Sequence, residues 1–241
     1  MTEHIGTLYG IGVGPGDPEL LTLKAVRLLN EVDLIFTAAS PGNDYSLARR
    51  IAGPHLKPGL EVRRLDFPMV GDEAALAAAW RANAAEIAAV LKSGRSAAFL
   101  TLGDPLTYST YGYVLPYLAE LVPPANLVTV PGITSYQSAA ARSNQPLASG
   151  LESLTILSGV ENPENLDGLL DLSDNVVILK TYRSFDGLLK MLEKKGLLDQ
   201  TTLYSKVGLP DEEIRADLGR RPLAAPPYLS LMIVKNGGRR K

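Results

Sequence analysis

A glycine-rich segment near the start of the chain, residues 10–18 (Gly-Ile-Gly-Val-Gly-Pro-Gly-Asp-Pro), is the first place where the sequence could bind a ligand. It follows an apolar run, and glycines let another molecule approach bare backbone closely. The segment does not fit the dinucleotide fingerprint Gly-x-Gly-x-x-Gly, because the third glycine would fall at Asp17. Pro15 and Pro18 lack amide donors, and Asp17 and Glu19 put negative charge where a pyrophosphate would lie. The segment is therefore a poor phosphate site, and a plain strand-to-helix turn without a ligand is the alternative.

Two further short loops also follow predicted strands, at residues 101–106 (Thr-Leu-Gly-Asp-Pro-Leu) and 130–135 (Val-Pro-Gly-Ile-Thr-Ser). Ligands of α/β proteins bind beyond the carboxyl ends of strands, so the three loops together indicate one shared crevice. Asp104 offers a carboxylate there, and Thr134 or Ser135 can offer a hydroxyl to a ligand. Turn formation by Asp104 and helix capping by the two hydroxyl residues are the alternatives.

The composition of the 241 residues excludes several classes of chemistry. There is no cysteine, which rules out disulfides, thiolate nucleophiles and iron–sulfur sites, and the two histidines, His4 and His55, cannot build a histidine-rich metal site. The net charge of −2 gives no general attraction to nucleic acid or anionic lipid. Residues 1–6 show no signal-peptide pattern, and no stretch approaches the roughly 18 apolar residues that span a bilayer. We therefore expect a cytoplasmic protein that holds no metal.

The three loops must be positioned by secondary structure. Short apolar runs alternate with amphipathic stretches along the whole chain. The clearest helix is expected at 72–93, where apolar residues recur at helical spacing among many alanines. This alternation predicts an α/β protein with sheets covered on both faces. Strands are expected at 8–13, 34–36, 61–65, 97–101, 127–130, 154–157, 176–179, 202–204 and 229–234, and helices at 19–30, 46–52, 72–93, 111–121, 135–143, 164–170 and 185–194.

Pro123-Pro124 is the predicted domain boundary, because two consecutive prolines end a helix and stiffen a connector. The chain would then form two α/β domains, residues 1–123 and 124–241, each with its own alternation of strands and helices.

Taken together, the three loops resemble those of the tetrapyrrole methyltransferases, also called class III methyltransferases. The shared features are the opening Gly-x-Gly-Pro-Gly-Asp with a following Leu21-Thr22, the Gly-Asp-Pro of the second loop and the Val-Pro-Gly-Ile-Thr-Ser of the third. The resemblance covers almost the whole chain, to Tyr228-Leu229-Ser230-Leu231. It implies the tetrapyrrole methylase fold of two domains with mixed sheets. In that fold S-adenosylmethionine lies folded in a cleft between the domains and leaves as S-adenosylhomocysteine.

Finer features resemble one branch of that family, the C20-methyltransferases of cobalamin biosynthesis. These features are Leu102-Gly103-Asp104-Pro105 followed by Tyr108-Ser109-Thr110, and Leu65-Asp66-Phe67-Pro68-Met69. Many other branches carry a glycine where this chain has Leu102. The branch implies precorrin-2 or cobalt-factor II as substrate, with any cobalt arriving in the macrocycle. It also implies a homodimer, a substrate site in the first domain and a cofactor site shared by both.

The resemblance assigns cofactor contacts residue by residue. The opening loop would pack on the cofactor, the second loop would hold its amino-acid part and ribose, and the third loop would add further contacts. Two looser matches follow later strands, one of them at 206–208 beside the adenine. The implied contacts are Pro15, Leu102, Gly103, Asp104, Thr107, Thr134, Ser135, Lys180 and Val207.

Methyl transfer to a reduced tetrapyrrole needs no covalent nucleophile, but C20 must afterwards lose a proton. A carboxylate, a tyrosine or water could accept it. The tyrosine candidates, chosen only by location, are Tyr108, Tyr111 and Tyr113, with core packing as the alternative for at least two. The substrate carries eight carboxylates, which suit arginine, and the candidates are Arg49, Arg50, Arg63, Arg64 and Arg183. An exposed, solvated face is the alternative for each. The loop 37–45, expected near the substrate, holds no lysine or arginine.

Three other functions stay open from sequence alone. One is a methyltransferase of the same fold that acts elsewhere, on another ring carbon, an RNA or a protein side chain. The second is a dinucleotide-dependent oxidoreductase, which the broken fingerprint disfavours. The third is a tetrapyrrole carrier without catalytic activity.

Overall fold

The computed structural model describes residues 4–39, 46–68, 70–220 and 223–236. The chain divides into two compact units, Met1–Thr134 and Ser135–Lys241. Most of the loop expected near the substrate, together with Met69, lies outside the described residues.

The first unit is a parallel sheet of five strands in the order β3-β2-β4-β1-β5. Its strands are β1 (Leu8–Gly12), β2 (Leu34–Ala39), β3 (Glu61–Asp66), β4 (Ala97–Thr101) and β5 (Leu127–Val130). Its helices are α1 (Leu23–Glu31), α2 (Leu47–Ala52), α3 (Glu73–Lys92) and α4 (Thr110–Ala119). Every strand pair is parallel, so the carboxyl ends of all five strands meet at one edge.

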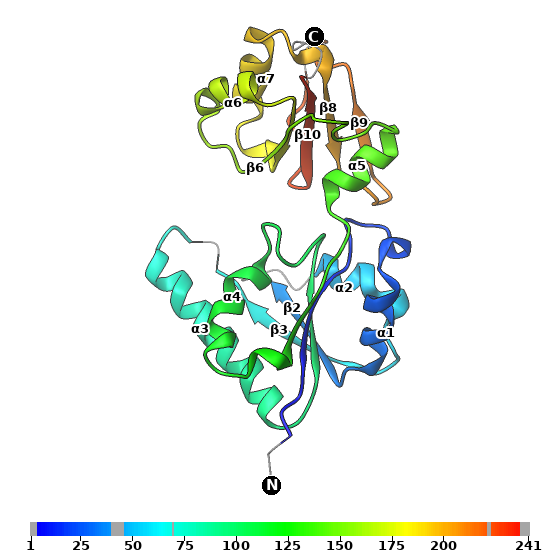
Figure 1. The fold of residues 1–241 in the computed structure, drawn as a ribbon, viewed down its shortest axis with the longest axis vertical. Helices are drawn as coiled ribbons and strands as arrows, with labels where there is room; N and C mark the ends of the chain where they lie inside the picture. Colours follow the sequence, from blue (N-terminus) through cyan, green and yellow to red (C-terminus); the bar gives the residue numbers. More distant parts are fainter. Residues whose placement is uncertain (1–3, 40–45, 69, 221–222, 237–241) are drawn as a thin grey trace. The chain divides into compact units, whose positions relative to one another are not determined.

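Two hydrophobic clusters cover the two faces of this sheet. Figure 1 shows α3 and α4 on one side of the strands and α1 and α2 on the other. Successive residues of β4 alternate between the clusters, because Phe99 packs with α3 and α4, whereas Ala98 and Leu100 pack with α1 and α2. Burial on both faces explains why the strands read as continuous apolar runs.

The second unit is a mixed sheet in the order β6-β7-β10-β8-β9. Its strands are β6 (Leu154–Ser158), β7 (Asn175–Leu179), β8 (Thr201–Ser205), β9 (Glu213–Arg215) and β10 (Ser230–Lys235). Its helices are α5 (Ser135–Ser143), α6 (Asp167–Leu172) and α7 (Phe185–Lys194), with α6 and α7 on one face and α5 on the other (Figure 1). The prediction of two α/β sheets is confirmed.

The predicted boundary at Pro123-Pro124 differs from the structure. The prolines do end α4, but the chain then makes a short turn and enters β5, which pairs with β1 from Leu8↔Leu127 to Ile11↔Val130. Asn126 Nδ2 also donates to the carbonyl oxygens of Ile5 (2.9 Å) and Gly6 (3.2 Å). The strand therefore belongs to the first sheet, and the units divide after Thr134.

Helix α3 contradicts the expectation that no stretch of the chain is apolar enough to span a bilayer. It is long and apolar enough, at a mean hydropathy of 1.2, to cross a bilayer by length and composition alone. Its many alanines raise the hydropathy although Arg81 and Glu86 interrupt the stretch. One face, with Asn83, Ile87 and Leu91, is buried in the core of the first unit. Core packing accounts for that face of the helix.

We predict that Gly10→Ala destabilises the first unit. A Cβ on Gly10 would lie 2.4–2.7 Å from ring carbons of Tyr111, which is fully buried and cannot move aside cheaply. Overpacking of this kind costs about 1–3 kcal/mol, measured as a lower urea midpoint. Gly53→Ala is the matched control, because no atom lies within 4 Å of its added Cβ. Equal midpoints for the two variants would contradict the prediction.

Candidate active site

The opening loop and the second loop are joined by backbone hydrogen bonds at the carboxyl edge of the first sheet. Val13 N donates to Thr101 O (2.9 Å), Gly14 N donates to Gly103 O (3.3 Å), and Gly103 N donates to Gly14 O (2.8 Å). Gly14 and Gly103 thereby form an isolated antiparallel bridge, with φ values of +79° and +67° that favour glycine. The amides of Val13 and Gly14 already have partners, so they are not free to bind a pyrophosphate.

The third loop packs directly on the first two. A Cβ on Gly132 would lie 2.2 Å from Gly103 O and 2.8 Å from Gly12 Cα, and a Cβ on Gly12 would lie 2.4 Å from Gly103 O. No side chain fits at either position, so Gly12 and Gly132 are required by close backbone contact. The three loops do meet, as the prediction of a shared crevice requires, and the crevice itself stays a prediction.

The Asp104 carboxylate ties the second loop to the third. Its Oδ1 accepts hydrogen bonds from Leu106 N (2.9 Å) and from Thr107 Oγ1 (3.2 Å). Its Oδ2 accepts one from Gly132 N (3.1 Å). Asp104 therefore has a structural role that its sequence context did not reveal, since Gly132 lies 28 residues further along the chain. Thr107 contributes to the same arrangement.

The remaining predicted cofactor contacts of the first unit lie in these same loops. Pro15 is buried in the opening loop, Leu102 is half-buried beside Gly103, and Thr134 is buried at the end of the third loop. His55 also stabilises the opening loop, although the sequence analysis considered this residue only as a metal ligand. Its Nε2 donates to Pro18 O at 3.0 Å and so fixes the turn after the opening loop.

The other predicted cofactor contacts belong to the second unit. Ser135 begins α5, Lys180 follows β7, and buried Val207 follows β8. Lys180 N donates to Ser230 O (3.0 Å), and the chain beside Val207 is held by a hydrogen bond to Leu229 O. Lys180 and Val207 therefore share one edge of the second sheet, on either side of β10.

The three candidate tyrosines have different surroundings. Tyr111 is fully buried against Gly10 with its hydroxyl 3.4 Å from Thr129 Oγ1, and burial raises the pKa of Tyr111. Tyr113 stacks on Trp80 with ring centroids 4.8 Å apart. Core packing accounts for Tyr111, and stacking between α3 and α4 accounts for Tyr113. Tyr108 alone stands beside the loops, 51% exposed and with a φ of 52°.

The candidate arginines divide into two groups. Arg49 and Arg50 are exposed on α2. Arg64 pairs with Asp66 (3.1 Å), while Arg183 donates to Tyr182 Oη (3.1 Å) and faces Glu161 (3.7 Å). Arg63 is likewise paired, with Glu61 at 2.6 Å. The strand β3 thus carries charges that neutralise one another along the sheet edge.

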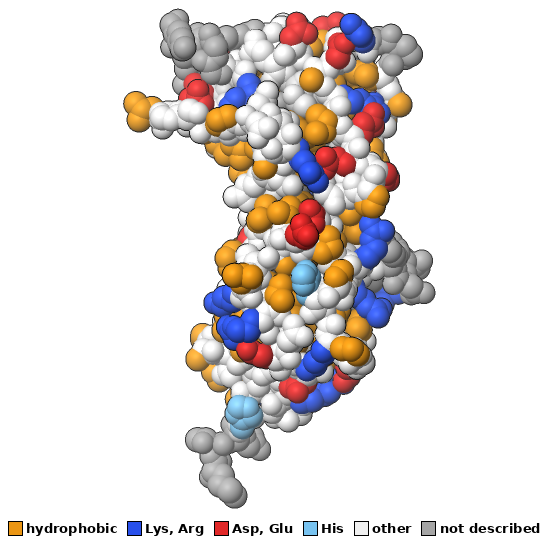
Figure 2. All heavy atoms as spheres, turned by 90° about the vertical axis from the view of Figure 1, so that its right-hand side faces the viewer, with side chains coloured by type: hydrophobic (Ala, Val, Ile, Leu, Met, Phe, Trp, Pro, Cys, Tyr) orange, Lys and Arg blue, Asp and Glu red, His pale blue; other side chains and the backbone are white. Residues whose placement is uncertain are grey.

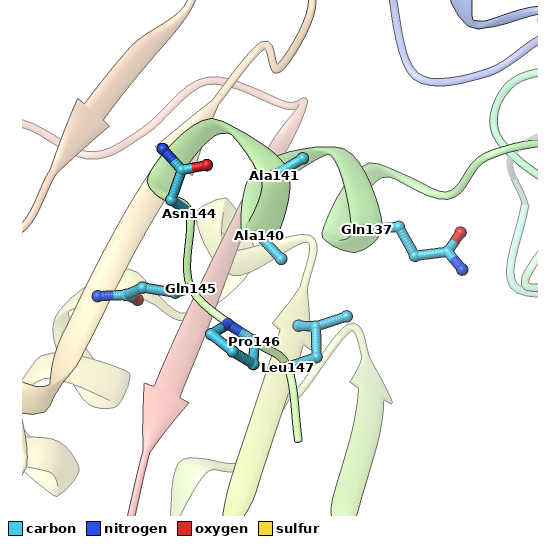
Figure 3. Close-up of a pocket in the computed structure, with 7 residues that line it drawn as sticks. All are labelled: Gln137, Ala140, Ala141, Asn144, Gln145, Pro146 and Leu147. Carbon is cyan, nitrogen blue, oxygen red and sulfur yellow. The ribbon is translucent and has the colours of Figure 1, made fainter. Parts of the chain in front are cut away.

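No predicted site residue lines the hollow of about 420 Å³ at the end of α5. Figure 3 shows that the side chains of Gln137, Asn144 and Gln145 point in different directions there, so they do not converge on a ligand.

On the face of the molecule in Figure 2, basic and acidic side chains are interspersed without a broad patch of one sign. Among the residues that the structure describes, no cluster of three His, Asp or Glu side chains could hold a metal ion.

The loops and both sheets correspond to a known class of enzymes. Residues 7–220 match the family model of the tetrapyrrole (corrin/porphyrin) methylases, and the chain belongs to this family. Its fold is also that of uroporphyrin-III C-methyltransferase from Thermus thermophilus, with a TM-score of 0.65, 26% identity and coverage of 97% of this chain and 94% of that one.

Two relatives narrow the comparison within the family. The cobalt-precorrin-2 C(20)-methyltransferase of Salmonella typhimurium is 34% identical over 233 residues, which are 95% of this chain and 96% of the relative. The precorrin-2 C(20)-methyltransferase of a Sinorhizobium species is 31% identical over 238 residues, 95% of each chain. The chain thus resembles both enzymes over nearly their full length.

We predict that Asp104→Asn opens the contact between the second and third loops. An asparagine can keep its oxygen toward Leu106 and Thr107 only by turning its amide nitrogen toward the donor Gly132 N. Hydrogen exchange at the Gly132 amide, measured without any ligand, should become about tenfold faster or more. Thr107→Val is the control, because it removes one hydroxyl and leaves the bond to Gly132 in place. Unchanged exchange in Asp104→Asn would show that the carboxylate does not hold the loops.

Proposed function

We propose that this protein transfers a methyl group from S-adenosylmethionine to C20 of precorrin-2 or of cobalt-factor II, in cobalamin biosynthesis. The observation that carries the proposal is its similarity, over nearly its full length, to two C20-methyltransferases. Leu102 at the start of the second loop supports the same branch.

The chemistry of the loops fits S-adenosylmethionine better than a dinucleotide. The cofactor's sulfonium is cationic, and Asp17, Glu19 and Asp104 give the loops an acidic character. The same acids would repel a pyrophosphate, and the amides of Val13 and Gly14 are already occupied. The close backbone contacts of Gly12 and Gly132 hold the three loops together, so a nucleoside would pack against the outer side of the joined loops.

When bound, the cofactor supplies an activated methyl group on sulfur. The chain's own task is to hold that methyl in line with the ring carbon and to exclude water. Pro15, Leu102, Gly103 and Thr134 would provide the contact surface, and Asp104 and Thr107 would keep it in shape. Ser135 and Val207 stay predicted cofactor contacts in the second unit.

Tyr108 is the side chain best suited to take part in loss of the C20 proton. It is exposed beside the loops, whereas the Asp104 carboxylate already accepts three hydrogen bonds. A neutral phenol is a weak base, so the Tyr108 oxygen would accept the C20 proton while its own hydroxyl proton moves to a water molecule. Arg49 and Arg50 would bind carboxylates of the substrate. Residence in the cytoplasm and assembly as a homodimer are further proposals from the family resemblance.

We expect the wild-type protein to convert precorrin-2, cobalt-factor II or both to a product with one added methyl group. The test uses S-adenosylmethionine labelled with ¹³C in its methyl, with mass spectrometry to count methyl groups and NMR to locate the label. Comparing the two substrates at equal concentration shows which one the enzyme prefers. A label on a ring carbon other than C20, or no transfer to either substrate, would overturn the proposal.

A thermal-shift comparison provides the control for cofactor class. S-adenosylhomocysteine should raise the melting temperature because it binds the native state, and NAD should not. The opposite pattern would favour the dinucleotide-dependent oxidoreductase.

A further inference from the structure

Two lysines occupy unusual backbone positions at one edge of the second sheet. β6 and β7 are parallel, and β7 and β8 are both antiparallel to β10 between them, so all three carboxyl ends meet at this edge. Lys180 follows β7 with a φ of 57°, and Lys206 follows β8 with a φ of 52°. Left-handed backbone is strained for residues with a side chain and is typical of glycine. Such strain is often found at functional positions.

Buried contacts hold Lys180 in this conformation. Its amide donates to Ser230 O (3.0 Å), and the next residue, Thr181, is 1% exposed and donates from Oγ1 to Ser230 Oγ (2.9 Å). A glycine would adopt this backbone without strain. The presence of lysine therefore calls for a role of its side chain.

The cations at this edge differ in their partners. The Lys206 ammonium is paired with Asp211, and the Arg183 guanidinium faces Glu161 and bonds to Tyr182 Oη. In the described part of the chain, no side chain forms an ion pair or hydrogen bond with the half-buried Lys180 ammonium. A partly desolvated cation without a counterion is unfavourable, and a bound anion would relieve this.

Aromatic surface lies in the segments beside Lys180. The Tyr182 and Tyr228 rings contact each other with centroids 5.2 Å apart and planes at 47°. Tyr228 stays 57% exposed. Exposed ring surface in the same edge as an unpaired ammonium suits a flat, apolar molecule that carries carboxylates on its rim.

Building on the proposed function, we propose that Lys180 binds a peripheral carboxylate of the tetrapyrrole substrate, with the Tyr182–Tyr228 pair as an adjoining packing surface. This differs from the cofactor contact that the family resemblance implied for Lys180. An ammonium beside the cofactor's sulfonium would place two positive charges together, whereas a substrate carboxylate neutralises the lysine.

The test is Lys180→Met, which removes the charge and nearly keeps the length of the side chain. The probe is uroporphyrin, a stable tetrapyrrole with eight carboxylates, and its binding is followed by fluorescence. We expect its Kd, and the KM for the methyl acceptor, to rise about tenfold, as for loss of one charge-assisted hydrogen bond. The Kd for S-adenosylhomocysteine, measured by calorimetry, should stay within about twofold of the wild-type value. Lys180→Arg should retain most of the uroporphyrin affinity.

Two further variants control for charge and for folding. Lys190→Met removes an exposed lysine from α7 in the same unit and should leave both affinities unchanged. Lys180→Gly removes the same charge while relieving the left-handed backbone, so its melting temperature should equal or exceed that of the wild type. It should nevertheless lose uroporphyrin affinity as Lys180→Met does.

Unchanged uroporphyrin affinity in Lys180→Met, or a loss confined to S-adenosylhomocysteine, would overturn the inference. A wild-type protein that methylates precorrin-2 while Lys180→Met behaves normally contradicts this inference alone. A wild-type protein that binds uroporphyrin through Lys180 but methylates neither substrate contradicts the proposed function alone.

Discussion

The candidate site depends on the contact of three loop backbones at the carboxyl edge of the first sheet. Gly12, Gly103 and Gly132 approach so closely that a Cβ on Gly12 or Gly132 would collide with main-chain atoms. The Asp104 carboxylate then fixes this contact by accepting the Gly132 amide. The parallel sheet makes the arrangement possible, because it brings the ends of β1, β4 and β5 side by side. The Asp104 carboxylate, which the sequence pattern assigned to ligand binding, thus also stabilises the loops themselves.

The second unit uses the same kind of edge with different chemistry. There Lys180 follows β7 and Lys206 follows β8, and their left-handed backbones lie on either side of the start of β10. Lys206 is neutralised by Asp211, whereas no side chain in the described part of the protein pairs with the Lys180 ammonium. An ammonium near two tyrosines suits a substrate with many carboxylates. The chemistry of this second edge therefore favours an anionic ligand.

The sequence predicted the elements better than the contacts between them. Buried parallel strands such as β4 read as continuous apolar runs, and glycine-rich loops mark their ends. The Pro123-Pro124 boundary was wrong because proline ends a helix without preventing the following strand from joining the same sheet. The partners of Asp104 and the left-handed lysines could not be predicted, because both depend on contacts between distant segments.

We expect the three joined loops of the first unit to hold the methyl donor. The most direct measurement is a crystal structure of the protein bound to S-adenosylhomocysteine. The ligand should lie against the main chain of Gly103 and Gly132 and the side chain of Thr134, with the Asp104–Gly132 hydrogen bond intact. Ligand bound elsewhere, such as in the hollow at the end of α5, with the loops unaltered, would contradict it.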